Sequence, residues 1–400
     1  NQVVATQNAC ELGEAWFRQE RPAVEEACRI DGALSSLEQG ITQAAGLLKQ
    51  GRWPLIYGLH RSTTQGQRAA LALAEKIGAV LDSPTSLRRG PMATTFRGVG
   101  EVTATLGEIR NRSDLVLFWG CNPMVTHPRH AELYSLLPAG EFLPNGRKDR
   151  YCVVVAEQAN ETAAVADAFV PLNTKQEFAA LWVLRAIVNE IPLDAEQVQR
   201  STGSPLSVWS DLAERMKNAK YGALLFEDAA GTGNPIRIEA LQALIKDLNR
   251  TNRFVGRSLG GAGNRSGADQ VFTWTTGFPS AISFSRRFPR FNPGEYSAQE
   301  TLEREEADVA LIVGTDCVEE LSEKARQRLR AIPTIFIDTQ PMDGNLRGNV
   351  EFVVSLPGVD ATGTTYRVDG VSFALRPLLS SPLLTDWELL MRISVALSPD

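Results

Sequence analysis

The sequence predicts a multi-domain α/β fold, with parallel sheets that carry helices on both faces. Two observations favour it. Short apolar runs recur between helical stretches, which is typical of βαβ units. The length of 400 residues also exceeds what one hydrophobic core usually serves. The candidate strands are residues 54–59, 115–119, 151–155, 223–226, 309–313, 334–337 and 352–356.

The first candidate strand leads into a complete helix signature. Ser62 and Thr63 are good N-caps for the Ala- and Leu-rich segment that continues to Lys76. Gly78 follows as a typical C-terminal stop. This region therefore predicts one strand, cap, helix and stop in order.

Two stretches interrupt the alternation of strands and helices. Residues 257–295 are rich in Gly, Asn, Ser and aromatic residues, and we expect a long ordered loop there that lines a site or an interface. Residues 83–105 follow the short apolar pair Val80-Leu81 and contain Arg88-Arg89-Gly90-Pro91. Ligands of open α/β sheets tend to bind at such strand ends.

Charge and cysteine usage exclude several classes of protein. The chain has 41 basic and 47 acidic residues, a net charge of −6, and no basic stripe, so we expect no nucleic-acid partner. The longest apolar run, residues 178–184, is too short to span a membrane. Five scattered cysteines without a CxxC pair favour reduced thiols and a cytoplasmic location. The chain begins at Asn1 rather than Met, so the presence of upstream residues stays open.

One segment concentrates reactive side chains. Cys121 and Asn122 follow the candidate strand 115–119, and His127, Arg129 and His130 come a few residues later. A metal site or a hydrolytic site using Cys121, His127 and His130 is one interpretation. Pro128 separates the two histidines and no acidic third ligand is near, which favours structural roles. There is no P-loop, no HExxH, and no GxGxxG after a strand.

Longer strings of sequence resemble a known family. The matching segments are Asn8-Ala9-Cys10, Leu55-Ile56-Tyr57-Gly58, Gly90-Pro91, Trp119-Gly120-Cys121-Asn122-Pro123, His127-Pro128-Arg129-His130, residues 270–279, Asn292-Pro293-Gly294-Glu295 and residues 363–370. Through them the chain resembles, over nearly its full length, the B subunit of tungsten or molybdenum formylmethanofuran dehydrogenase, a branch of the molybdopterin oxidoreductases.

The resemblance implies a discontinuous domain layout like domains 1–3 of formate dehydrogenase and DMSO reductase, without their C-terminal β-barrel. Residues 1–50 with 351–400 would be the remnant of an iron–sulfur cluster domain. Residues 51–88 with 221–350 would form one α/β domain, and residues 89–220 an inserted α/β domain.

The departures from the family concern its cofactors. Arg88-Arg89 stands where the family has Cys-His, and a guanidinium cannot replace the metal-binding thiolate. Ala156, Glu157 and Gln158 open the segment where the family has a pterin-binding Asp-Pro-Arg-Lys-Thr loop. Only Cys10 of the four cluster cysteines has a counterpart. The resemblance therefore implies that tungsten or molybdopterin and the [4Fe–4S] cluster are lost. Vestigial pocket positions would be Cys121, Asn122, His127, Arg129, His130, Ala156, Glu157 and Gln158.

This pattern resembles the branch found in the bacterial formyltransferase/hydrolase complex. The resemblance implies a non-catalytic subunit whose partners are an amidohydrolase A subunit, a β-helical C subunit and a formyltransferase D subunit. That complex converts formyl-tetrahydromethanopterin to formate through a formylated furan carrier. The carrier's polyglutamyl tail is a possible ligand of Arg286, Arg287 and Arg290. An active tungsten or molybdopterin dehydrogenase subunit and an independent hydrolase stay open as alternatives.

Overall fold

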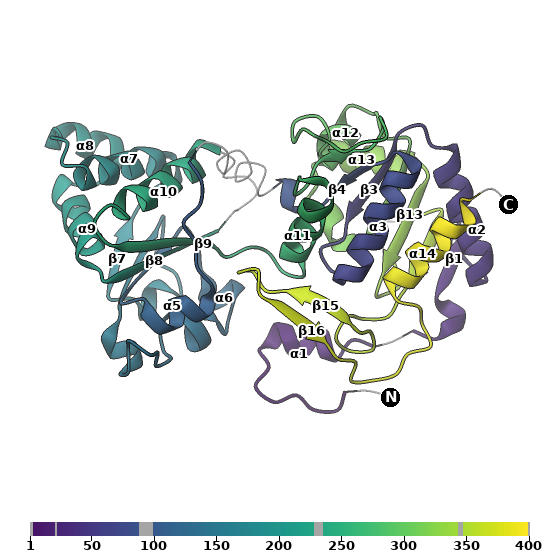
Figure 1. Cartoon of the computed structure of the whole chain (residues 1–400), viewed down its shortest axis with the longest axis horizontal. Helices are drawn as coiled ribbons and strands as arrows, with labels where there is room; N and C mark the ends of the chain where they lie inside the picture. The colour runs from purple at the N-terminus through teal and green to yellow at the C-terminus, as the bar shows by residue number, and fades with distance from the viewer. Residues whose placement is uncertain (1–2, 21, 88–98, 228–234, 343–346, 399–400) are drawn as a thin grey trace. The chain divides into compact units, whose positions relative to one another are not determined.

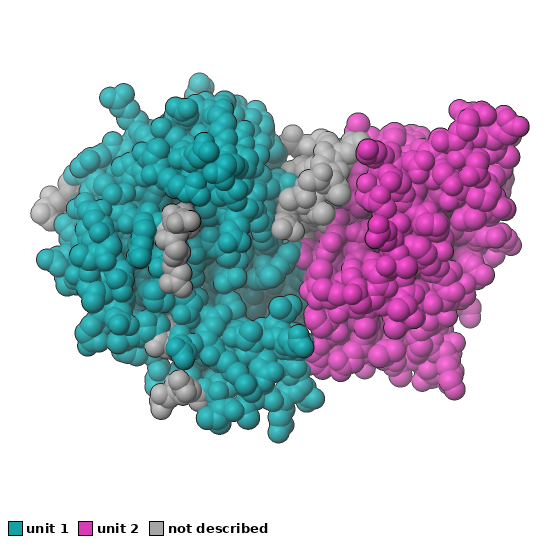
Figure 2. All heavy atoms as spheres, turned by 180° about the vertical axis from the view of Figure 1, so that it is seen from behind, with its two compact units in different colours: residues 1–87, 261–400 teal, residues 88–260 magenta. Residues whose placement is uncertain are grey.

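The computed structural model describes residues 3–20, 22–87, 99–227, 235–342 and 347–398. The chain divides into two compact units, distinguished by colour in Figure 2. Unit 1 comprises residues 1–87 and 261–400, and unit 2 comprises residues 88–260. Each unit has its own sheet with parallel strands, so the prediction of an α/β fold with parallel sheets is confirmed.

Unit 1 is built on a nine-stranded sheet in the order β11-β10-β4-β3-β12-β13-β14-β1-β2. The five central strands are parallel, and antiparallel strands extend both edges. A separate hairpin pairs β15 with β16. The bounds are β1 Cys28–Ile30, β2 Ala33–Leu34, β3 Pro54–Gly58, β4 Val80–Asp82, β10 Ile282–Ser283, β11 Arg290–Phe291, β12 Val309–Val313, β13 Thr334–Asp338, β14 Val350–Val353, β15 Gly363–Tyr366 and β16 Ser372–Leu375.

Helices cover both faces of this sheet because its central strands alternate between two cores. Ile56 packs with α2, α3, α11 and α14 in one core, whereas its neighbours Leu55 and Tyr57 pack with α12 and α13 in the other. The first group of helices is visible together in Figure 1. The helices of unit 1 are α1 Glu11–Phe17, α2 Leu37–Gln50, α3 Thr64–Ile77, α11 Arg265–Thr276, α12 Ala298–Glu303, α13 Glu323–Ala331 and α14 Asp386–Ala396, with short 3-10 turns at Val24–Glu26 and Thr315–Glu320.

Unit 2 is a five-stranded, fully parallel sheet in the order β7-β6-β5-β8-β9. The long helices α7 to α10 pack on one face against Leu117, Val153 and Leu224. The strands are β5 Leu115–Trp119, β6 Tyr151–Ala156, β7 Ala168–Pro171, β8 Tyr221–Phe226 and β9 Arg253–Ser258. The helices are α5 Leu106–Arg112, α6 Pro123–Thr126, a π-helical turn Ala131–Ser135, α7 Glu177–Val188, α8 Ala195–Thr202, α9 Leu206–Asn218 and α10 Pro235–Leu248, with 3-10 turns at Gly146–Asp149, Ala163–Val165 and Thr174–Gln176.

The predicted strand, cap, helix and stop around α3 are confirmed. The Thr63 hydroxyl accepts a hydrogen bond from the Gly66 amide, which makes Thr63 the N-cap. Gly78 ends the helix with φ 73°, the left-handed conformation that favours glycine. No helix among the described residues is both long and apolar enough to cross a membrane.

The division into units differs from the layout expected from the sequence. The boundary expected at residue 220 lies inside the sheet of unit 2, because β8 pairs with β5 and β9 pairs with β8. Residues 1–50 and 351–400 belong to unit 1, because β1 and β14 extend its sheet and α14 packs on α2 and α3.

The prediction of a long loop over residues 257–295 is wrong for the central part of this segment. Residues 265–276 form α11, whose Phe272 is fully buried in the core of unit 1. Trp274 on the same helix is exposed, with its ring edge-on to Tyr366 at a centroid distance of 5.9 Å. Phe278 stacks on Phe291 at 5.1 Å. Apolar positions of α11 facing α3 therefore outweigh the Gly and Asn content on which the loop prediction relied.

Candidate functional site

The carboxyl end of β5 places the reactive segment of unit 2. The chain leaves the strand through Gly120, with φ 61°, and reaches Asn122. The Asn122 side chain makes hydrogen bonds within the unit. It donates to Glu161 at 2.7 Å and accepts from the Thr162 hydroxyl at 2.7 Å. Asn122 therefore holds the loop after β6 rather than facing an open pocket.

A buried ion pair lies beside this strand end. The guanidinium of Arg237, on α10, lies 2.6 Å from the carboxylate of Glu177, on α7, and both side chains are less than one tenth exposed. The Trp119 indole donates to the other Glu177 oxygen at 2.5 Å. Arg237 also donates to the Glu227 carbonyl at 3.3 Å. These groups occupy the carboxyl edge with protein contacts of their own.

The structure does not bring Cys121 and the histidines together as a nucleophile and base. The buried Cys121 thiol donates to the Leu225 carbonyl at 3.4 Å, and burial raises its pKa well above the ordinary range. His127 contacts the Thr126 hydroxyl at 2.9 Å, and burial lowers its pKa. A thiol that resists ionisation and imidazoles that resist protonation are the reverse of an activated nucleophile and base.

His130 is a packed core imidazole. It lies edge-on to Phe118 and next to Tyr134, with ring centroid distances of 6.2 and 6.0 Å. Burial, aided by the nearby His127, lowers the pKa of His130 to about 3. Arg129, which lies between the two histidines in the sequence, forms an exposed ion pair with Glu132 at 3.1 Å. The structural interpretation of this segment fits its surroundings better than the catalytic one.

Because His130 is buried in its neutral form, we expect acid to lower the stability of unit 2. The pKa of His130 in the unfolded chain is near 6.5, so acid protonates the unfolded state first and destabilises the folded state. At pH 5 this linkage costs about 2 kcal/mol relative to pH 7.5. We expect His130→Phe to lose less stability than the wild type between these pH values, measured by urea unfolding. An identical loss in both proteins would contradict the buried neutral imidazole.

The segment after β6, where the family resemblance implies a pterin-binding loop, carries carboxylates. Ala156 is half-buried, and Glu157 and Gln158 are exposed. Glu157 accepts a hydrogen bond from Asn173 at 2.7 Å, and the hydrogen bond from Asn122 lowers the pKa of Glu161. Anionic side chains repel a pyrophosphate. Glu157 and Glu161 are therefore unfavourable neighbours for a pyrophosphate group. Among the described residues, no three His, Cys, Asp or Glu side chains form a group that could hold a metal ion.

The carboxyl edge of the unit 1 sheet contains a topological switch point, which the sequence alone did not indicate. Chain order reverses between β3 and β12, the position where open α/β sheets bind ligands. The buried His60 imidazole and the Arg61 guanidinium both contact the Asp316 carboxylate, at 2.9 and 2.7 Å. Burial alone would raise the pKa of Asp316, but its hydrogen bond from His60 and the nearby positive charges leave it lowered. Arg61 and Asp316 also line a cavity of about 590 Å³ at this edge, so their salt bridge forms part of the cavity wall.

Backbone ties fix the loop after β3. The buried Gln67 amide donates to the carbonyls of Leu59 and Asn264 at 3.0 Å each. Gly58 has φ 107°, and a Cβ there would lie 2.2 Å from the Val313 carbonyl oxygen. Only glycine fits this close approach of β3 to β12.

Asp82 anchors the segment that leads to residue 88. Its buried carboxylate accepts from the Ser86 hydroxyl at 2.6 Å and from the amides of Ala281 and Ala298 at 2.9 and 2.7 Å. Burial raises the pKa of Asp82 to about 7, against the effect of these hydrogen bonds. The predicted positions Arg88 and Arg89 lie outside the described residues.

The remaining predicted positions are dispersed over unit 1. Cys10 is half-buried at the N-terminus of α1 and is not in a disulfide. Arg286 and Arg287 are exposed in the turn between β10 and β11. Arg290 is half-buried, with its guanidinium carbon 5.2 Å from the centroid of the Tyr296 ring. The structure therefore groups these arginines on one short hairpin at the sheet edge.

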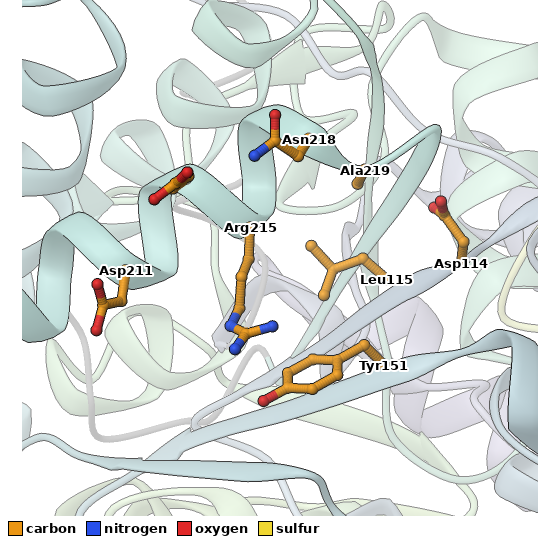
Figure 3. Close-up of a pocket in the computed structure, with 8 residues that line it drawn as sticks. Asp114, Leu115, Tyr151, Asp211, Arg215, Asn218 and Ala219 are labelled. Carbon is orange, nitrogen blue, oxygen red and sulfur yellow. The ribbon is translucent and has the colours of Figure 1, made fainter.

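A cavity of about 580 Å³ lies at the opposite, amino-terminal edge of the unit 2 sheet (Figure 3). The Arg215 guanidinium carbon lies 4.2 Å from the centroid of the Tyr151 ring. Asp114 caps the amides of Lys220 and Tyr221 at 2.9 Å each. The cavity is therefore distinct from the strand ends where the sequence predicts a cofactor position.

Comparison with known proteins decides the family. No family model matches the chain. The chain is 34% identical over 401 residues to the B subunit of tungsten-containing formylmethanofuran dehydrogenase 2 from Methanococcus maripaludis, covering 98% of this chain and 92% of the relative. The chain belongs to the family of formylmethanofuran dehydrogenase B subunits. The B subunit of the same enzyme from Methanocaldococcus jannaschii is also 34% identical, with the same coverage.

A further relative of this member of the B-subunit family comes from Methylorubrum extorquens. The Fhc B subunit of its formyltransferase/hydrolase complex is 27% identical over 293 residues, covering 71% of the chain and 74% of the relative. The resemblance predicted from the sequence motifs is confirmed.

Solved structures agree on the fold of this B-subunit family member. A chain in the crystal structure of the formyltransferase/hydrolase complex FhcABCD from Methylorubrum extorquens, in complex with methylofuran, gives a TM-score of 0.76 at 23% identity. It covers 93% of this chain and 98% of that chain. Acetylene hydratase from Pelobacter acetylenicus gives a TM-score of 0.59 at 11% identity, covering 91% and 59%. At these identities the matches describe the fold alone.

Proposed function

We propose that this chain is a non-catalytic subunit of a formyltransferase/hydrolase complex that converts formyl-tetrahydromethanopterin to formate through a formylated furan carrier. The observation that carries the proposal is the sequence Arg88-Arg89-Gly90-Pro91, which has no thiolate where the family resemblance implies the metal ligand. The carboxylates of Glu157 and Glu161 beside the carboxyl ends of β5 and β6 support it, because they disfavour a phosphate-rich cofactor.

The proposed partners are an amidohydrolase A subunit, a β-helical C subunit and a formyltransferase D subunit, in the cytoplasm. The relationship to the Fhc B subunit supports this assembly. In it, the chain would hold its partners in place without touching reacting atoms. Cys10 would then be a vestige of the cluster domain, and Arg286, Arg287 and Arg290 could contact the carrier's anionic tail.

A second candidate function is that of an active, tungsten-dependent dehydrogenase B subunit. The specific observation in its favour is the alignment to the two methanogen proteins, which has higher identity and longer coverage than the alignment to the Fhc B subunit. Residues 88 and 89 are arginines, so that function would need a protein ligand to the metal other than a cysteine thiolate at this position.

Assembly with the partners tests the proposed function. We expect the chain, co-expressed with the A, C and D subunits, to enter a stable complex visible by native mass spectrometry. Omitting it should reduce carrier-dependent formyl hydrolysis, because the partners lose their arrangement. A monodisperse monomer whose omission leaves that hydrolysis unchanged would contradict the proposal.

A further inference from the structure

The outward face of helix α7 of unit 2 is mostly apolar. Its inward residues, such as Leu181 and Leu184, are fully buried in the core of the unit. On its outward side, Phe178 is 36% exposed and Trp182 is 49% exposed. A helix of a lone soluble unit normally presents charged or polar residues to solvent. An aromatic pair one turn apart on the outer face is typical of a contact surface.

A neighbouring helix carries another exposed apolar side chain. α10 runs alongside α7 in the same direction, since Glu177 pairs with Arg237 near the start of both helices and Arg185 pairs with Asp247 near their ends. Ile236, at the start of α10, is 51% exposed. We name Phe178, Trp182 and Ile236 the α7 patch. Figure 1 shows the two helices side by side in the left-hand unit.

The α7 patch is ordered before anything binds to it. The Phe178 and Trp182 rings meet edge to face at a centroid distance of 6.1 Å. The Arg185 guanidinium carbon lies 4.3 Å from the centroid of the Trp182 ring, and Asp247 holds that guanidinium at 2.8 Å. Binding therefore orders little that is not already fixed. Trp and Arg are also the residue types that dominate the energy of protein interfaces.

The charges around the patch select the kind of partner. Basic side chains outnumber acidic ones on and next to α7 and α10, even though Arg185 and Arg250 pair with Asp247 and Lys217 pairs with Glu190, and although the whole chain has a net charge of −6. A second copy of this chain would set these like charges against each other across a twofold interface, which is unfavourable. A partner with carboxylates around an apolar centre fits instead. The flanking residues are Lys175, Arg185, Lys246 and Arg250, with Glu239 and Asp247.

We infer that the α7 patch docks a companion subunit whose contact surface is apolar at its centre and acidic at its rim. The inference rests on the proposed function, since the occupant belongs to the same complex. The aromatic pair supplies the desolvated centre, and the basic side chains orient the acidic rim.

The test compares a double substitution in the patch with a matched control. Phe178→Ser with Trp182→Ser should weaken binding of the full chain to the assembled A, C and D subunits by roughly 30-fold, the effect of losing one interface hot spot. Trp387→Ser on α14, a tryptophan of similar exposure at 44%, should bind like the wild type. Unchanged urea midpoints would show that all proteins are folded. Kd is measured by biolayer interferometry.

A second variant tests the charges without touching the aromatic pair. Lys246→Glu with Arg250→Glu should slow association and remove most of its salt dependence. If the wild type assembles and both double variants assemble equally well, this inference is overturned while the proposed function stands. If the wild type fails to bind the companions, both fall. If the Ser variants lose only self-association, the occupant is a second copy and the inference is wrong.

Discussion

Replacing Arg237 with Met should lower the free energy of unfolding by about 3–5 kcal/mol, because it leaves the buried Glu177 carboxylate without its cation. Both partners are less than one tenth exposed and lie 2.6 Å apart. The Trp119 indole, which donates to Glu177, would become the main remaining compensation. The loss is measured by urea unfolding of the full chain at pH 7.5.

A second substitution separates the stranded charge from lost packing. Glu177→Gln added to Arg237→Met keeps an acceptor for the Trp119 indole and removes the charge, so it should restore most of the lost stability. Arg200→Met is the surface control, since Arg200 and Glu196 are 70% and 86% exposed and their pair should contribute less than about 1 kcal/mol. Equal losses in the single and double variants would show that the charge is not the cause.

The strands were predictable where the signal is local. Runs such as residues 115–119 and 309–313 are continuous, apolar and buried, and they form β5 and β12 with the predicted bounds. β9 was missed because Gly256 and Arg257 interrupt its apolar residues. Its strand conformation comes from parallel pairing with β8, to which it is connected through α10.

The candidate site was predictable only in part, because much of it depends on contacts between distant segments. Pro128 between the two histidines, visible in the sequence, favours a structural role for His130, and Glu132 two residues further on pairs with Arg129 instead of completing a ligand set. His60 and Asp316 carry no such signal, since more than 250 residues separate them and only the pairing of β3 with β12 brings them together. The same holds for Glu177 and Arg237, which meet through the packing of α7 on α10.

The cofactor content of the purified protein is the largest difference between the two candidate functions. A chain with Arg88 and Arg89 in place of the thiolate, and with Glu157 after β6, should bind neither the metal nor the pterin dinucleotide. Arg88→Cys alone should not restore binding, because the carboxylates near the dinucleotide position remain. The unchanged protein and this variant form a matched pair.

The most direct measurement is elemental analysis of the complex purified from cells grown with tungstate and molybdate, combined with extraction of any pterin. We expect background levels of both metals and no pterin, in the wild type and in Arg88→Cys. Close to one tungsten or molybdenum atom per chain in the wild type, with a pterin dinucleotide, would contradict this expectation and identify the chain as part of an active dehydrogenase.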